Sequence, residues 1–83
     1  MPQSVSLDSL VVGQRGVIRQ VAGNDAITQR LMEMGVNDDE IVELIARAPL
    51  GDPLEIRIRG YQLSLRISEA KRILVEPTAG GAS

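Results

Sequence analysis

The sequence contains no cysteine, histidine, tryptophan or phenylalanine, and Tyr61 is its only aromatic residue. Without cysteine, disulfides and thiolate metal sites are excluded. Without histidine, the usual base that activates a serine or threonine nucleophile is missing. Ser68 and Lys71 lie close in sequence, but a helix-capping serine and a solvated lysine explain that pair more simply. No glycine-rich phosphate loop is present. We therefore expect no catalytic residues and no enzyme activity.

Basic character and long apolar runs are also lacking. The 83 residues carry a formal net charge of −2, whereas nucleic-acid binding usually needs a basic face or aromatic stacking platforms. No apolar run approaches the roughly 18–20 residues that span a bilayer. The N-terminus lacks the basic and apolar regions of a secretory signal. These features predict one cytoplasmic domain, without nucleic acid as a partner and without membrane insertion.

Two alternating runs on either side of Gly60-Tyr61 predict a β-hairpin. Apolar and polar residues alternate from Leu54 to Arg59 and again from Gln62 to Ile67, as in half-buried strands. Gly60-Tyr61 is expected to form a two-residue type II′ turn. The resulting register pairs Ile58 with Leu63, Ile56 with Leu65 and Leu54 with Ile67 on the inner face, and Arg57 with Ser64 and Glu55 with Arg66 on the outer face.

The other expected elements follow from periodicity and capping residues. They are a helical turn at Ser6–Leu10, strands at Arg15–Val21, Glu40–Arg47 and Ile73–Val75, a helix at Ala26–Met34 and a helical turn at Ser68–Lys71 capped by Ser68. In the first strand, Val17 and Val21 should share one face and Ile18 the other. In the helix, Ile27, Leu31 and Met34 should form the buried stripe, and Gly35 the left-handed cap.

The order of these elements predicts a mostly β fold. Five short strands with one inserted α-helix and short helical turns fit a small closed β-barrel, because closure removes edges that short strands could not protect. The alternative is an open α+β sheet with the helix covering one face. We expect an ordered core from about residue 6 to 77 in a single domain, with residues 1–4 mobile and 78–83 disordered.

The segment Ala48-Pro49-Leu50-Gly51-Asp52-Pro53, followed by Arg59-Gly60 and Leu63-Ser64-Leu65-Arg66, resembles the FeoA family of small cytoplasmic proteins of bacterial ferrous iron uptake. Arg30-Leu31 and Met34-Gly35-Val36 resemble the family's helix and the turn after it. The resemblance spans about Leu7 to Val75 and is most specific from Ala48 to Asp52. It implies an SH3-like barrel and a non-enzymatic accessory protein that docks on the FeoB membrane transporter and its GTPase domain.

Similar domains also occur fused to other proteins, including metal-dependent repressors. The alternative function is therefore a free-standing regulatory domain related to the C-terminal domain of those repressors. That role would need a DNA-binding helix-turn-helix in the same chain, and the sequence shows none.

Five residues are candidates for partner binding. Leu50 is an aliphatic residue at a loop tip, and Tyr61 is a lone aromatic at a hairpin turn; apolar anchors of this kind inside a polar rim are typical of modest interfaces. Arg57 and Arg59 could supply that rim. Met32 lies off the apolar stripe of its helix. The competing interpretation makes the Ala48–Pro53 loop a rigid connector and Tyr61 a lid on the barrel end.

Metal binding is a weaker hypothesis. Asp38-Asp39-Glu40 could offer oxygen ligands for a weak divalent site, but selective Fe(II) sites usually also use imidazole or thiolate, and acidic residues are ordinary in turns. We therefore expect no dedicated metal site and no cofactor.

The isolated chain should accordingly hydrolyse no GTP and bind Fe(II) only weakly. Anaerobic titration calorimetry with Fe(II) is the direct measurement. A stoichiometric submicromolar site would contradict this interpretation of the carboxylates.

Overall fold

A computed structural model describes residues 3–78, and the expectations for residues 1–2 and 79–83 lie outside that range. Six antiparallel strands form one sheet in the order β1-β6-β2-β3-β4-β5. The elements are β1 (Val5–Ser6), η1 (Leu7–Ser9), β2 (Arg15–Val21), α1 (Ala26–Glu33), β3 (Ile41–Arg47), β4 (Leu54–Ile58), β5 (Tyr61–Leu65), α2 (Ile67–Ala70) and β6 (Ile73–Pro77). The mostly β expectation is confirmed, with one strand more than predicted, because Val5–Ser6 pairs with β6. The predicted full closure was wrong, because β1 and β5 lie at the two ends of the strand order and do not pair with each other.

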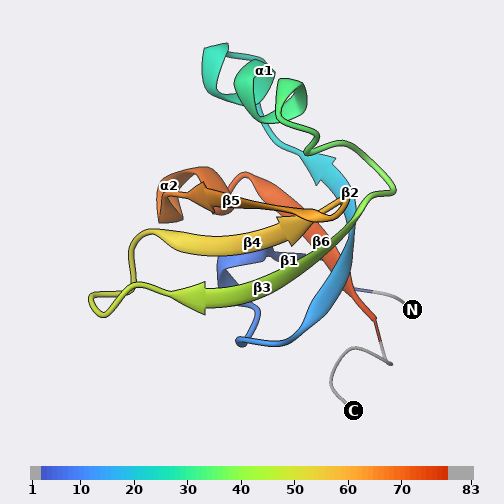
Figure 1. The fold of residues 1–83 in the computed structure, drawn as a ribbon. Helices are drawn as coiled ribbons and strands as arrows, with labels where there is room; N and C mark the ends of the chain where they lie inside the picture. The colour runs from blue at the N-terminus through green and yellow to red at the C-terminus, as the bar shows by residue number, and fades with distance from the viewer. Residues whose placement is uncertain (1–2, 79–83) are drawn as a thin grey trace.

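The sheet curls around one aliphatic core, and α2 and η1 contact each other near its two edge strands (Figure 1). All the fully buried large side chains are aliphatic, as the near-absence of aromatics requires. They are Leu7, Leu10, Ile18, Leu31, Val36, Val42, Leu44, Leu54, Ile56, Ile58, Leu65, Ile73 and Val75. Burial of this apolar surface is the main stabilising term of so small a domain.

The hairpin is present, but its predicted register was wrong by two residues. Leu54 pairs with Leu65 and Ile58 with Tyr61. The turn is Arg59-Gly60, whose φ angles of 52° and 89° match a type I′ turn, the other two-residue turn that follows the strand twist. A shift of two residues keeps every side chain on its predicted face. It does break the predicted Glu55–Arg66 pair, because Glu55 now lies opposite Ser64.

Strand β2 has the predicted bounds but a different inner face. A β-bulge interrupts its pairing with β6 between Ile18 and Gln20, and the extra residue reverses the alternation beyond it. Ile18 and Val21 are therefore both buried, so the prediction that Val17 and Val21 share a face against Ile18 was wrong. Strand β3 follows its prediction, with Val42 and Leu44 buried and Ile41 exposed.

Helix α1 projects from one end of the barrel (Figure 1). Leu31 and Thr28 are buried and Met34 is half-buried, but Ile27 is exposed, so Ile27 was wrongly assigned to the buried stripe. The helix begins after Asp25, whose side chain accepts a hydrogen bond from the Thr28 N–H.

The ends of both helices show what each cap contributes. Gly35 has a φ of 101° after the last turn of α1, which confirms the predicted left-handed cap. Helix α2 starts one residue earlier than predicted, with Arg66 and not Ser68 at its N-cap. The reason is Glu69, whose carboxylate accepts a hydrogen bond from the Arg66 N–H at 2.9 Å in the manner of a capping box.

Leu65→Ala should lower the free energy of unfolding by roughly 2–5 kcal/mol, because it removes a fully buried side chain and leaves a cavity. Urea denaturation followed by circular dichroism measures the change. Leu50→Ala, at an exposed position, is the matched control and should leave the transition midpoint almost unchanged. Equal effects of the two substitutions would contradict the assigned core.

Candidate functional site

The β3–β4 loop combines a fixed base with an exposed apolar tip. Its base is closed by hydrogen bonds from the Ala48 N–H to the Pro53 carbonyl at 3.0 Å and from the Gly51 N–H to the Ala48 carbonyl at 2.7 Å. The Asp52 carboxylate accepts a hydrogen bond from the Ile67 N–H at 3.1 Å, which ties the loop to α2. Leu50 at the tip is 96 % exposed. The loop is therefore both a connector and the carrier of a solvated aliphatic side chain.

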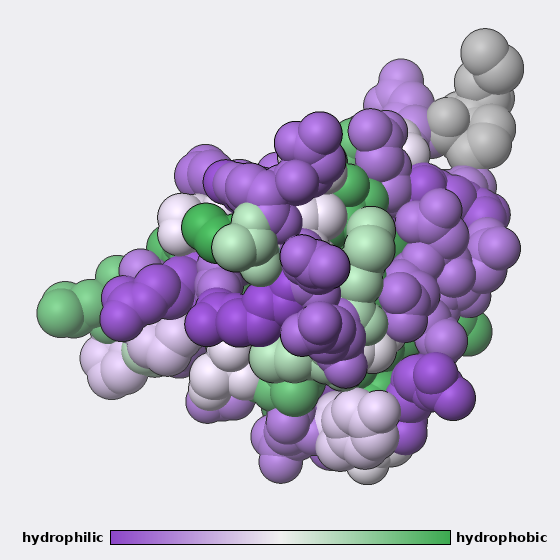
Figure 2. Space-filling model, turned by 90° about the horizontal axis from the view of Figure 1, so that it is seen from above, coloured by the Kyte–Doolittle hydropathy of each residue, from purple (hydrophilic) through white to green (hydrophobic). Residues whose placement is uncertain are grey.

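Two further exposed valines lie at the same end of the barrel. Val11 is 65 % exposed and Val12 55 % exposed. The segment that precedes them is held beside the end of β3 because the Arg47 guanidinium donates to the carbonyls of Asp8 and Leu10 at 2.6 and 2.7 Å. We call Val11, Val12 and Leu50 the loop-end surface. Figure 2 shows the protruding loop ending in hydrophobic atoms.

The alternation patterns do not reveal Val11 and Val12, which lie between elements. Two adjacent apolar residues before a glycine, outside any periodic run, are the one signal that could have found them.

Tyr61 lies at the opposite end of β4 from this loop. It follows the Arg59-Gly60 turn and is 52 % exposed. Arg59 forms an ion pair with Glu40 at 3.5 Å, and both Tyr61 and Arg59 lie beside Gly35 at the end of α1. Leu50 and Tyr61 therefore belong to two separate surfaces.

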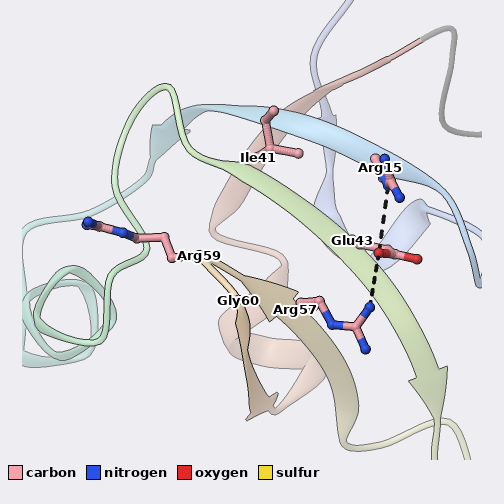
Figure 3. A pocket seen from close by; sticks show the side chains of 6 residues that line it. All are labelled: Arg15, Ile41, Glu43, Arg57, Arg59 and Gly60. Carbon is pink, nitrogen blue, oxygen red and sulfur yellow. Dashed lines mark ion pairs between the residues drawn. The ribbon is translucent and has the colours of Figure 1, made fainter.

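Arg57 lies on the outer face of the sheet, in a ladder of charges across three strands. The Glu43 carboxylate is 3.7 Å from both the Arg15 and the Arg57 guanidinium. These side chains line a shallow hollow of about 240 Å³ that also includes Ile41 and Gly60. In Figure 3, Arg15, Glu43 and Arg57 point toward one another, whereas Arg59 extends away from them. Arg59 also lines this hollow, so the two candidate arginines border the same hollow although their guanidinium groups point in different directions.

Met32 is exposed on α1, where it lines a second hollow of about 300 Å³ with Gly23, Asn24, Asp25, Thr28 and Gln29. None of the other four candidate residues lines this hollow. The five candidates thus fall on four parts of the surface: the loop end, the hairpin end, the sheet face and α1.

Ion pairs attach α1 to the rest of the chain. Arg30 pairs with the buried carboxylate of Glu69 on α2, and Arg72 pairs with Asp25 at 2.7 Å. The Thr28 hydroxyl adds a hydrogen bond to the Ala22 carbonyl at 3.0 Å. The hydrogen bond from the Thr28 N–H, together with the Arg72 guanidinium, lowers the pKa of Asp25 below its ordinary value of 3.8.

The carboxylates considered for metal binding are largely engaged by cations. Asp39 pairs with Arg19 at 3.0 Å and Glu40 with Arg59. Within residues 3–78, no group of three or more acidic side chains is placed to hold a metal ion. The Asp8 carboxylate is also paired with a cation, since it lies 3.3 Å from the Lys71 ammonium group.

No helix within residues 3–78 is long and apolar enough to cross a membrane.

Comparison with known proteins identifies the family. The FeoA domain matches residues 5–77, which is nearly all of the described chain. This chain belongs to the FeoA family. The chain is also 35 % identical over 77 residues to the Fe(2+) transport protein A/Fe(2+) transporter FeoB fusion protein of Porphyromonas gingivalis. The alignment covers 93 % of this chain and 9 % of the fusion protein.

Solved structures support the same assignment. The FeoA-like protein of Clostridium acetobutylicum superimposes with a TM-score of 0.89 at 31 % identity, over 100 % of this chain and 96 % of that one. The zinc complex of Stenotrophomonas maltophilia FeoA, described as a prokaryotic SH3 domain protein, gives 0.74 at 36 % identity over 87 % and 89 %. The SH3-like fold and the link to iron transport are thereby confirmed.

A manganese-dependent transcriptional repressor shares the fold with a TM-score of 0.85. Its identity to this FeoA domain is 19 %, and the match covers 94 % of this chain and 38 % of the repressor. At that identity the likeness concerns the fold alone.

The Asp25 ion pair predicts a pH-dependent stability. Because the pKa of Asp25 is lowered on folding, its contribution is present above the unfolded value and is lost as the pH falls through the folded value. Asp25→Asn keeps a capping oxygen but no charge. The variant should be less stable than the parent near neutral pH, and the difference should vanish in strong acid.

Thermal unfolding across an acid pH series measures this difference. Asp38→Asn, at an exposed carboxylate without an ion pair among residues 3–78, is the matched control. A constant gap between Asp25→Asn and the parent at every pH would contradict the electrostatic explanation.

Proposed function

We propose that this FeoA domain is a non-enzymatic accessory protein of bacterial ferrous iron uptake that acts by binding a FeoB-type transporter on its cytoplasmic side. The observation that carries the proposal is the relative from Porphyromonas gingivalis, in which the homologous domain and FeoB form one polypeptide. Two domains fused in one organism are held at high effective concentration. A separate chain of the same family would need a surface that replaces this covalent link.

The loop-end surface is the best candidate for that role. Leu50, Val11 and Val12 are aliphatic side chains exposed to solvent, as the apolar anchors of an interface are before a partner covers them. The Arg47 guanidinium and the Asp52 carboxylate hold the surrounding backbone in place, so little conformational entropy would be lost on binding. Apolar anchors on a preorganised loop fit recognition by contact, without chemistry of the domain's own.

Tyr61 and Arg59 at the hairpin end, Arg57 on the sheet face and Met32 on α1 remain candidates for secondary contacts. Of these, Tyr61 is the most suitable anchor, since aromatic residues dominate interface energetics.

Regulation in the manner of a metal-dependent repressor is the alternative. It is supported only by the likeness of fold to the manganese-dependent repressor, and residues 3–78 contain no helix-turn-helix that could read DNA. The same fold serves different functions through different sites, so the fusion with FeoB carries more weight.

Leu50→Glu should leave thermal unfolding unchanged, because the side chain makes no buried contact, yet weaken binding to the transporter by about tenfold or more through loss of an apolar anchor. Pull-down with detergent-solubilised FeoB-type transporter and iron uptake in cells measure the effect. Gln20→Glu, which adds the same charge at an exposed position of β2, is the control.

Tyr61→Ala extends the same test to the hairpin end and should have a smaller effect. If Leu50→Glu and Tyr61→Ala both stay folded and support normal binding and uptake, the docking surface lies elsewhere and Met32 becomes the next candidate.

A further inference from the structure

Strand β5 has an open edge. It is the last strand of the sheet and pairs with β4 alone. In an antiparallel pair closed by a two-residue turn, the residues flanking the turn are hydrogen-bonded, and bonded and non-bonded pairs then alternate. Ile58–Tyr61, Ile56–Leu63 and Leu54–Leu65 are therefore the bonded pairs. The backbone N–H and C=O groups of Gln62 and Ser64 point away from β4, and within residues 3–78 no backbone group pairs with them.

This edge lacks the usual protection against pairing with another chain. Natural edge strands carry charges, prolines or bulges, or are very short. β5 runs for five residues, Tyr61–Leu65, without a charged residue, a proline or a bulge. Gln62 and Ser64 are both exposed. By contrast, the other edge strand, β1, has only two residues.

The surroundings of the edge favour an anionic occupant. A hollow of about 310 Å³ joins Ser64 and Arg66 to the base of the β3–β4 loop at Asp52 and Pro53, with Arg30 and Glu69 beside it. Of the two carboxylates there, Glu69 pairs with Arg30 and caps Arg66, whereas Asp52 accepts a hydrogen bond from the Ile67 N–H and keeps its charge. The Arg66 guanidinium is exposed and forms no ion pair with any residue of 3–78. It is the cation that remains available.

We propose that an extended segment of the transporter partner adds to the β5 edge as a further strand and places a carboxylate against Arg66. Backbone hydrogen bonds to Gln62 and Ser64 would give affinity, and the arginine would give register and selectivity, as in other strand-addition complexes. The hollow leads to the loop that carries Leu50, so one segment could reach both. This inference rests on the proposed function and specifies how the partner binds.

A second copy of the chain fits this edge less well. Antiparallel pairing of two β5 strands would bring Arg59 of one copy near Arg66 of the other, and like charges across an interface are unfavourable. A segment of opposite charge meets no such repulsion.

Two substitutions at one position separate backbone pairing from side-chain contact. Ser64→Ala and Ser64→Pro both remove the hydrogen bond from the Ser64 hydroxyl to Glu55, but only proline removes the outward N–H. Proline is tolerated at a strand edge when the lost N–H faces solvent. The probe is purified FeoB-type transporter in detergent, with binding measured by biolayer interferometry.

Ser64→Pro should raise Kd by about tenfold or more, whereas Ser64→Ala should change it by less than about threefold. Arg66→Gln should weaken binding and reduce its dependence on salt, because a charge pair is lost. If Ser64→Pro does not fold, amide hydrogen exchange on the parent chain replaces it: the Gln62 and Ser64 N–H groups should become protected when the transporter is added.

The outcomes distinguish this inference from the proposed function. A parent chain that binds the transporter while Ser64→Pro binds equally well, or while the Gln62 and Ser64 amides stay unprotected, overturns the edge site and leaves the accessory role standing. Loss of a concentration-dependent dimer in Ser64→Pro with unchanged transporter binding would assign the edge to self-association and also overturns the inference. A parent chain that does not bind the transporter removes the proposed function itself.

Discussion

The pairing of β4 with β5 through the Arg59-Gly60 turn is the constraint on which the rest of the structure depends. Both residues have positive φ, so the turn takes the type I′ form, and the strands that leave it can pair in only one register with their apolar residues inward. That register buries Leu54, Ile56 and Leu65. It also decides which groups remain outside, namely the open β5 edge and Arg66, which forms no ion pair within residues 3–78. The core and the open edge are thus consequences of one turn.

The second constraint is electrostatic and concerns α1. This helix contributes few apolar contacts and is attached through Arg30–Glu69 and Arg72–Asp25. Removing one partner of a pair that involves a buried carboxylate such as Glu69 is costly, because the remaining charge is left uncompensated. The ends of the barrel therefore differ in character: the loop end is apolar and open, and the end that carries α1 is held by charge pairs.

Much of the fold could be predicted from the sequence because the aliphatic residues follow the periods of strands and helices closely. The bounds of β2 and the inner face of β3 are examples. Errors arose where a local pattern allowed two solutions. Gly60 fits a type II′ turn with Tyr61 or a type I′ turn after Arg59, and alternation cannot distinguish registers that differ by two residues. The bulge near Arg19 and the early start of α2 at Ile67, which depends on the hydrogen bond between Glu69 and the Arg66 N–H, rest on contacts that no period encodes.

The candidate site was less accessible to sequence reasoning. Leu50 could be recognised because an aliphatic residue at a loop tip is costly in water. The separation of Leu50 from Tyr61 could not be predicted, because strand order decides which loops lie at the same end of a barrel. Val11 and Val12 lie outside every periodic run, and the β5 edge became visible only when non-local pairing placed it. Exposed backbone groups in particular leave no trace in the amino-acid sequence.

We propose that this FeoA domain works by direct contact with a FeoB-type transporter. A nuclear magnetic resonance titration of the isotope-labelled chain with the purified GTPase domain of that transporter tests it most directly. We expect saturable changes in chemical shift that are confined to Val11, Val12 and Leu50 at the loop end and to Gln62–Arg66. Spectra that remain unchanged with an excess of the GTPase domain, and also with an excess of the intact transporter in detergent, would contradict direct contact.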